Sequence, residues 1–263
     1  MPSAMRGWVR ALLVEVARGG LPPETPEILR AASAVWARVE AQVRPDRAAA
    51  MVEVAKTFFG ESPRAAEAML REAHDVDVQR RLEELLLWRL EPAWLERYAR
   101  VDGLEPQGEP STFVTLAAPH PWLVVTVLGH ALPGLGGVVD ATPGGRRDRG
   151  LAARFDRANA ALPAERLTWE AANAVRGRRN LLWAASLGPG GGSRAAGAGS
   201  LRVGGLPIRE VQGPLRPVTV TRERDKRWRV VVGPSGDFAD AESAFHQAVA
   251  RTPAQFLPWL SAR

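Results

Sequence analysis

The segment Thr112–Gly129, TFVTLAAPHPWLVVTVLG, decides the interpretation of the fold because it is the most apolar stretch of the chain and has a histidine at its centre. The residues before the histidine form an extended, alternating run, and a second apolar run follows Pro121. Proline is tolerated at the first position of a helix, where its missing N–H would have no partner. The segment therefore predicts a strand that ends near His120 and a helix that begins directly after it.

A histidine at such a junction has two interpretations. It is either a boundary residue satisfied by its neighbours or a base in an active site, since an imidazole exchanges a proton near neutral pH. The sequence around His120 leaves both open at this point.

Composition restricts the classes of protein and of site. The 263 residues and 46% hydrophobic content fit one large α/β domain or two small ones. The absence of cysteine excludes disulfides and thiolate nucleophiles, and the four histidines show no metal-ligand spacing, so we expect no metal and no bound cofactor. Near the N-terminus, Glu15 and Arg18 interrupt the apolar run, which predicts neither a signal peptide nor a membrane span. We expect a cytoplasmic protein, with a peripheral position at the inner face of the plasma membrane left open.

The charge is unevenly distributed along the chain. Residues 141–230 carry 18 Lys and Arg against 7 Asp and Glu, whereas the whole chain has a net charge of only +6. A basic half beside an acidic half favours an anionic partner such as a phosphate-bearing co-substrate, an acidic carrier protein or lipid headgroups. Nucleic acid is a weaker alternative because no recognisable binding module accompanies the charge.

The order of predicted elements indicates an α/β fold. Residues 1–97 read as amphipathic helices with starts near Pro26 and Pro63, and form a helical cover. Residues 98–263 read as an α/β core within a single domain, with strands near 98–102, 112–116, 138–142 and 180–186. Helices are expected over 149–162 and 163–176, and residues 187–205 form a glycine-rich loop that lacks the Gly-Lys pair of a phosphate-binding loop. We therefore predict a mostly parallel central sheet flanked by helices.

The C-terminal part predicts a β-hairpin followed by helices. The runs PVTV and WRVVV flank a turn near Asp225, and a capped helix over 240–251 and a short proline-initiated helix follow. The arginines near the turn read as a solvated face or as an anion-binding rim: Arg222, Arg224, Arg227 and Arg229.

Three short segments carry a resemblance to a known family. They are VDGLE (101–105), LRPVTVTRERDKRWRVVVGP (215–234) and ARTPAQFLPWL (250–260). Together with the element order, they resemble the entry strand, the hairpin and the closing Pro-x-Gln-aromatic segment of the bacterial lipid A and lysophospholipid acyltransferases. The likeness in element order covers most of the chain, while motif identity is confined to these pieces.

The resemblance implies an activity and a set of site residues. In that family a histidine, four residues and then Asp or Glu form a catalytic pair that activates a lipid hydroxyl to attack an acyl thioester. His120 matches the histidine, but Val125 stands at the acidic position, and Asp140 is the substitute carboxylate that we consider. Residues expected to bind substrate are Arg146, Arg147, Arg149 and Trp122.

The resemblance implies an acyl-CoA or acyl-carrier-protein donor and a lysophospholipid or glycolipid acceptor. Because a base without its orienting carboxylate is much slower, the substitution at Val125 leaves open whether the protein is an enzyme. The alternative is a catalytically inactive relative that keeps the fold and binds lipid or a partner enzyme at the membrane surface.

Overall fold

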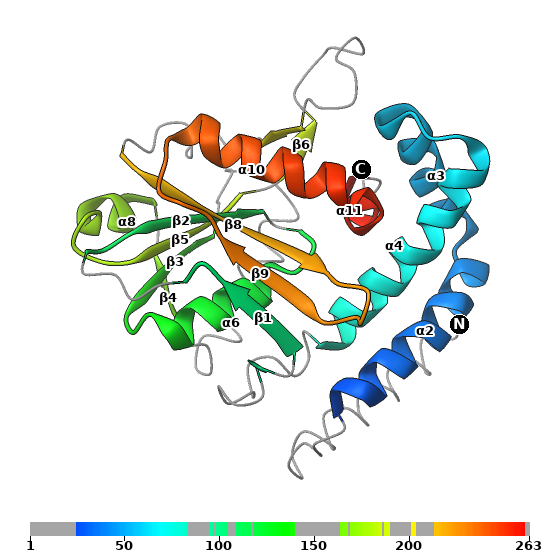
Figure 1. The fold of residues 1–263 in the computed structure, drawn as a ribbon, viewed down its shortest axis with the longest axis horizontal. Coiled ribbons are helices and arrows are strands. Elements are labelled where there is room, and N and C mark those ends of the chain that lie inside the picture. Colours follow the sequence, from blue (N-terminus) through cyan, green and yellow to red (C-terminus); the bar gives the residue numbers. More distant parts are fainter. Residues whose placement is uncertain are drawn as a thin grey trace. The chain divides into compact units, whose positions relative to one another are not determined.

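A computed structural model describes residues 25–83, 95–96, 98–104, 109–116, 118–139, 164–167, 169–185, 187–189, 201–203 and 213–260. Their contacts form two compact units (Figure 1). The helical unit contains the described residues up to Tyr98 together with residues 222–227 and 252–260. The sheet unit contains residues from Ala99 to Thr221 and from Trp228 to Arg251.

The described strands of the sheet unit form a seven-stranded sheet in the order β1-β9-β8-β2-β5-β3-β4. Their bounds are β1 (Ala99–Asp102), β2 (Thr112–Leu116), β3 (Leu135–Val139), β4 (Ala164–Leu167), β5 (Leu181–Ala185), β8 (Leu215–Arg222) and β9 (Trp228–Val232). Strand β9 pairs in parallel with β1, β2 with both β8 and β5, and β3 with both β5 and β4. The predicted α/β fold is confirmed, and the prediction of a mostly parallel sheet holds in part because β8 and β9 pair antiparallel.

Strands β8 and β9 form the predicted hairpin. The N–H of Glu223 donates to the carbonyl of Arg227, and the N–H of Gly233 donates to that of Pro217, which is the pattern of an antiparallel pair. Trp228, Val230 and Val232 are buried, so they share one face as the alternation predicts.

Strand β2 lies within the sheet and has all five residues buried, as expected for a strand covered on both faces. Strand β2 ends at Leu116, and helix α6 (Pro121–Ala131) follows with His120 as its N-cap residue. This helix is buried without a break from Pro121 to Gly129 and packs against β2, β3 and β4. The predicted start of a helix directly after His120 is therefore confirmed, whereas the strand before it ends earlier, at Leu116.

Two predictions on this side of the sheet are wrong. Residues 164–167, expected to start a helix, form the edge strand β4, and helix α8 is shorter, at Trp169–Val175. Pairing with β3 overrides the helical pattern of the sequence there. The strand expected near 138–142 instead begins at Leu135, so Gly136 and Gly137 lie inside β3, and a Cβ at Gly136 would press on the side chains of Leu167 and Leu181. The helix expected over 149–162 lies outside the described residues.

The glycine-rich segment is not wholly a loop. Its ends form two short strands, β6 (Leu187–Pro189) and β7 (Leu201–Val203), which pair antiparallel. The C-terminal helix of the sheet unit, α10 (Phe238–Arg251), buries an apolar face made of Ala241, Phe245, Ala248 and Val249.

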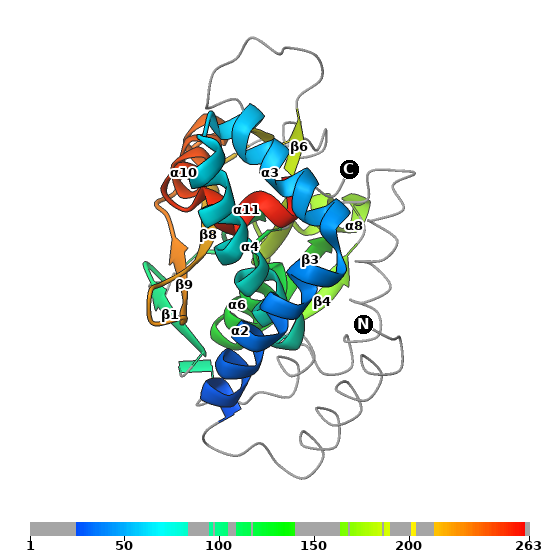
Figure 2. The ribbon, with the colours of Figure 1, turned by 90° about the vertical axis from the view of Figure 1, so that its right-hand side faces the viewer.

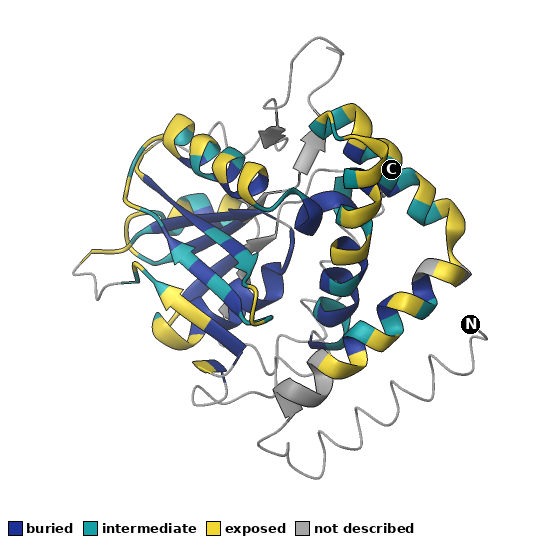
Figure 3. Cartoon of the chain, turned by 45° about the vertical axis from the view of Figure 1, so that its right-hand side comes forward, coloured by how far each residue is buried: buried dark blue, intermediate teal, exposed yellow. Residues whose placement is uncertain are grey.

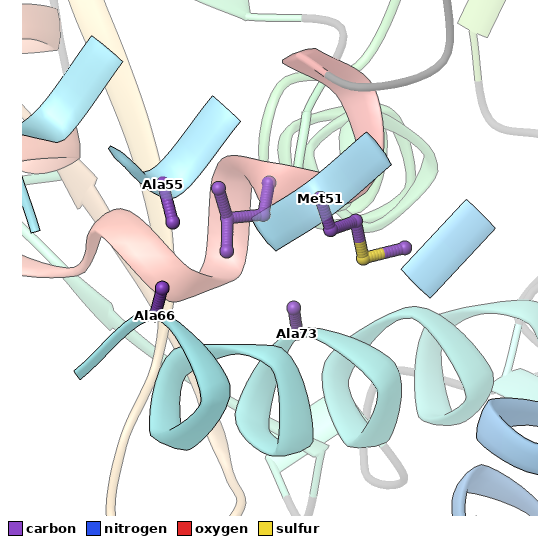
Figure 4. Packing of buried hydrophobic residues seen from close by; sticks show 5 residues of the cluster. Met51, Ala55, Ala66 and Ala73 are labelled. Atoms are coloured by element: carbon purple, nitrogen blue, oxygen red, sulfur yellow. The ribbon is translucent and has the colours of Figure 1, made fainter. Parts of the chain in front are cut away.

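The helical unit is built around α4 (Pro63–Glu83), which packs against α2 (Thr25–Val43), α3 (Pro45–Phe59) and α11 (Pro253–Leu260) (Figure 2). The predicted helix starts near Pro26 and Pro63 are confirmed. Met51 and Ala55 of α3 point toward Ala66 and Ala73 of α4, and with Leu257 they form an apolar cluster (Figure 4). Although α4 is rich in charged residues, much of it is buried (Figure 3).

Candidate functional site

The site predicted from the sequence centres on His120, at the carboxyl end of β2. Its side chain is 0% exposed. The imidazole ring meets the indole ring of Trp228 edge to face, with the ring centroids 4.9 Å apart and the planes at 76°. Trp228 is also fully buried, so the pair forms part of the core at this edge of the sheet.

The topology explains why these two residues meet. Strand β2 runs parallel to its neighbour β8, with Thr115 opposite Val218. Because β8 turns back into β9, the first residue of β9 lies at the same edge as the end of β2. The sequence predicts that Trp228 begins a hairpin strand, but it does not connect this residue with His120. The connection requires the parallel pairing of β8 with β2, for which the two segments carry no local signal.

The carboxyl end of β2, near His120, is also the point where the strand order reverses. From β2 the chain passes through α6 to β3 on one side, and from β5 it later crosses to β8 on the other side of β2. In open α/β sheets, ligands bind outside the carboxyl ends of the strands at such a switch point. The location of His120 therefore suits a binding site, although its ring is covered.

The structure places no acid where the family motif has one. Val125 is buried within α6, and the first turn of that helix contains no acidic residue. Asp140 lies outside the described residues. Strand β3, which ends one residue before it, pairs with β5 and β4, so β5 intervenes between β3 and β2.

The predicted substrate-binding residues divide into two groups. Arg146, Arg147 and Arg149 lie outside the described residues. Trp122 is buried in the first turn of α6, and its backbone carbonyl accepts a hydrogen bond of 2.8 Å from the Thr126 hydroxyl. The structure therefore brings Trp122 and His120 into the same strand-to-helix junction.

The hairpin arginines, for which the sequence suggests a solvated face or an anion-binding rim, are mostly bonded within the protein, while Arg224 is exposed. The Arg222 side chain is only 7% exposed, and it donates to a carboxylate oxygen of Asp75 at 2.9 Å and to the amide oxygen of Gln79 at 3.0 Å. Arg227 donates to the carbonyl of Glu96. Arg229 pairs with Asp102 at 2.7 Å, and the two hydrogen bonds to Asp102 from Arg229 and Arg100 lower the pKa of that exposed carboxyl. Three of the four hairpin arginines thus form hydrogen bonds or ion pairs within the protein.

The closing segment of the chain has a clear structural role. Gln255 is buried on α11, and its side-chain amide bonds both backbone groups of Arg222: it accepts from the N–H at 2.6 Å and donates to the carbonyl at 2.8 Å. The glutamine of the Pro-x-Gln-aromatic segment therefore continues the hydrogen bonding of the hairpin strand.

Within the described residues, no group of three His, Asp or Glu side chains is placed to hold a metal ion. None of the described helices is long and apolar enough to cross a membrane. A scan against protein-family models found no match for this sequence, and a search of curated proteins found none either. An acyltransferase activity of this protein is therefore a proposal.

Proposed function

We propose that the protein is acyltransferase-like and transfers an acyl group from acyl-CoA or acyl-carrier protein to the hydroxyl of a lysophospholipid or glycolipid. The observation that supports this best is the position of His120. It lies beyond the carboxyl end of a central strand of a largely parallel sheet, near the switch point of the strand order, and directly before a buried helix. This is the location that the motif resemblance assigns to the catalytic base.

In this proposal the imidazole of His120 takes the proton of the acceptor hydroxyl while the oxygen attacks the thioester carbonyl. The tetrahedral intermediate collapses with cleavage of the C–S bond, and the leaving thiolate takes the proton from the imidazolium. Asp140 orients the ring, Trp122 contacts substrate, and Arg146, Arg147 and Arg149 bind phosphate of the donor or acceptor. Because His120 is fully buried, the junction has to open before a hydroxyl reaches the ring.

A second candidate is a catalytically inactive relative that binds lipid or a partner enzyme at the cytoplasmic face of the membrane. Two observations favour it. Val125 fills the acidic position with a buried apolar side chain, and His120 is packed against Trp228 as a core residue. A buried aromatic contact gives the histidine a structural reason to be there without any chemistry.

Acyl transfer by the purified full chain distinguishes the two candidates. The assay presents a labelled acyl thioester with a panel of lysophospholipids and glycolipids to the wild type, His120→Gln and Val125→Glu, with the exposed His130→Gln as a matched control. The enzyme proposal predicts transfer by the wild type and by His130→Gln, and loss of transfer in His120→Gln. An inactive wild type refutes it, and transfer gained only by Val125→Glu supports the inactive relative.

A further inference from the structure

His74 is an unusual buried histidine in the helical unit. It lies on α4 with its side chain 1% exposed, and neither ring nitrogen has a hydrogen-bond partner among the described residues. Buried polar groups in native proteins nearly always have partners, so an exception requires a physical explanation.

Charged side chains from α2, α3 and α4 lie near enough to this ring to act on its pKa. Asp77 of α4 pairs with Arg47 of α3 at 2.8 Å, and with its own helix neighbours Arg80 at 2.9 Å and Arg81 at 3.2 Å. Glu40 of α2 pairs with Arg47 at 3.3 Å and also with Arg81. Two carboxylates are thus already paired with three guanidinium groups. Helix α11, which also packs on α4, has no titratable side chain between Pro253 and Leu260.

Burial and the nearby guanidinium groups favour the neutral state of the histidine in the folded unit. Burial lowers the pKa of His74 below its ordinary 6.5; Glu40 and Asp77 act in the opposite direction, and Arg47 and Arg81 act in the same direction. A protonated ring would add a fourth positive charge beside carboxylates that are already paired, and it would have little water to solvate it. The exposed ring of an opened unit carries no such penalty.

We propose that the helical unit is an acid-sensitive element, in which proton uptake by His74 loosens α4 from α2 and α3. Opening there would expose the apolar cluster that α3, α4 and α11 share, which contains Met51, Ala55, Ala66, Ala73 and Leu257. The proposal does not depend on acyl transfer, because no residue in it belongs to the site at His120.

Amide hydrogen exchange of the full chain between pH 7.5 and 5.0 tests this locally, with each rate divided by its intrinsic value at that pH. We expect peptides from residues 31–83 to exchange faster as the pH falls, by up to about tenfold per unit where the opened state binds one more proton. Peptides from β2 and β5, which lie wholly in the sheet unit, should not respond. Asp77, with a pKa of about 2, remains ionised throughout this range, so the response reports a histidine.

His74→Leu should abolish the acceleration, whereas His130→Gln, which removes an exposed histidine of α6, should keep it. If His74→Leu does not fold, His74→Gln replaces it, since glutamine also cannot titrate. Equal protection of the wild-type helical unit at pH 7.5 and 5.0 would overturn the proposal without any variant. Equal acceleration in the wild type and the His74 variant would overturn it as well.

Discussion

Replacing Asp77 with asparagine should destabilise the helical unit strongly at neutral pH. The carboxylate is only 2% exposed and forms ion pairs with Arg47, Arg80 and Arg81, which come from two helices. The Asp77→Asn substitution keeps the shape of the side chain but removes the negative charge that these three guanidinium groups share. Removing one partner of a buried ion pair is costly because the opposite charge stays buried without compensation.

The lowered pKa of Asp77 gives the size of the expected loss of stability. Burial raises the pKa of this carboxyl, and the charges of Arg80, Arg81 and Arg47 lower it by more, to about 2 from an ordinary 3.8. Each pKa unit corresponds to about 1.4 kcal/mol, so the ionised carboxylate contributes roughly 2 to 3 kcal/mol at neutral pH. Because the pKa is lower in the folded state, this contribution is complete above about pH 4 and is lost as the pH falls toward 2.

Urea unfolding followed by far-ultraviolet circular dichroism measures the effect. At pH 7, Asp77→Asn should lower the free energy of unfolding by about 2 to 3 kcal/mol, and the difference from wild type should shrink between pH 4 and pH 2. Asp46→Asn, which removes an exposed carboxylate in the first turn of α3, is the matched control and should cost well under about 1 kcal/mol. A difference for Asp77→Asn below about 1 kcal/mol at pH 7, or one that does not change with pH, would refute the reasoning.

Three further predictions are tested by urea unfolding. Gly103→Ala should lower the free energy of unfolding more than Gly60→Ala. Both glycines have positive φ, for which alanine costs about 1 to 2 kcal/mol, but only at Gly103 would the new Cβ collide with a backbone carbonyl. Gln255→Leu should cost about 2 kcal/mol because the hairpin backbone loses both of its bonds to the side-chain amide. Trp228→Ala should lower the free energy of unfolding by about 3 to 5 kcal/mol, and Trp228→Phe should lower it less, since phenylalanine keeps a ring against His120. Equal losses of stability in the two Trp228 variants would contradict an aromatic contact there.

Much of the sheet unit could be predicted because its signals are local. The alternation before His120, the proline after it, and the apolar runs of the hairpin each specify an element within a few residues. Strand β4 could not be predicted, since its sequence, AERL, has no strand pattern of its own. Only its pairing with β3, a strand well before it along the chain, makes it a strand.

The site could be predicted only in its position along the chain. The sequence places His120 at the end of a strand, but its contact with Trp228 depends on the order of strands in the sheet, which periodicity does not specify. The polar network around His74 and Asp77 was not predicted for a similar reason. On α4 these residues look like one face of a surface helix, and only the packing of α2 and α3 over them makes them buried.

The proposed function is tested most directly by the rate at which purified protein moves a labelled acyl group from a thioester to a lysophospholipid or glycolipid hydroxyl. The proposal predicts measurable transfer by the wild type and a fall of at least about 100-fold in His120→Gln, the usual scale for losing a general base. Transfer at the same rate by both proteins would contradict a catalytic role for His120. No transfer by the wild type to any acceptor in the panel would contradict the enzyme itself.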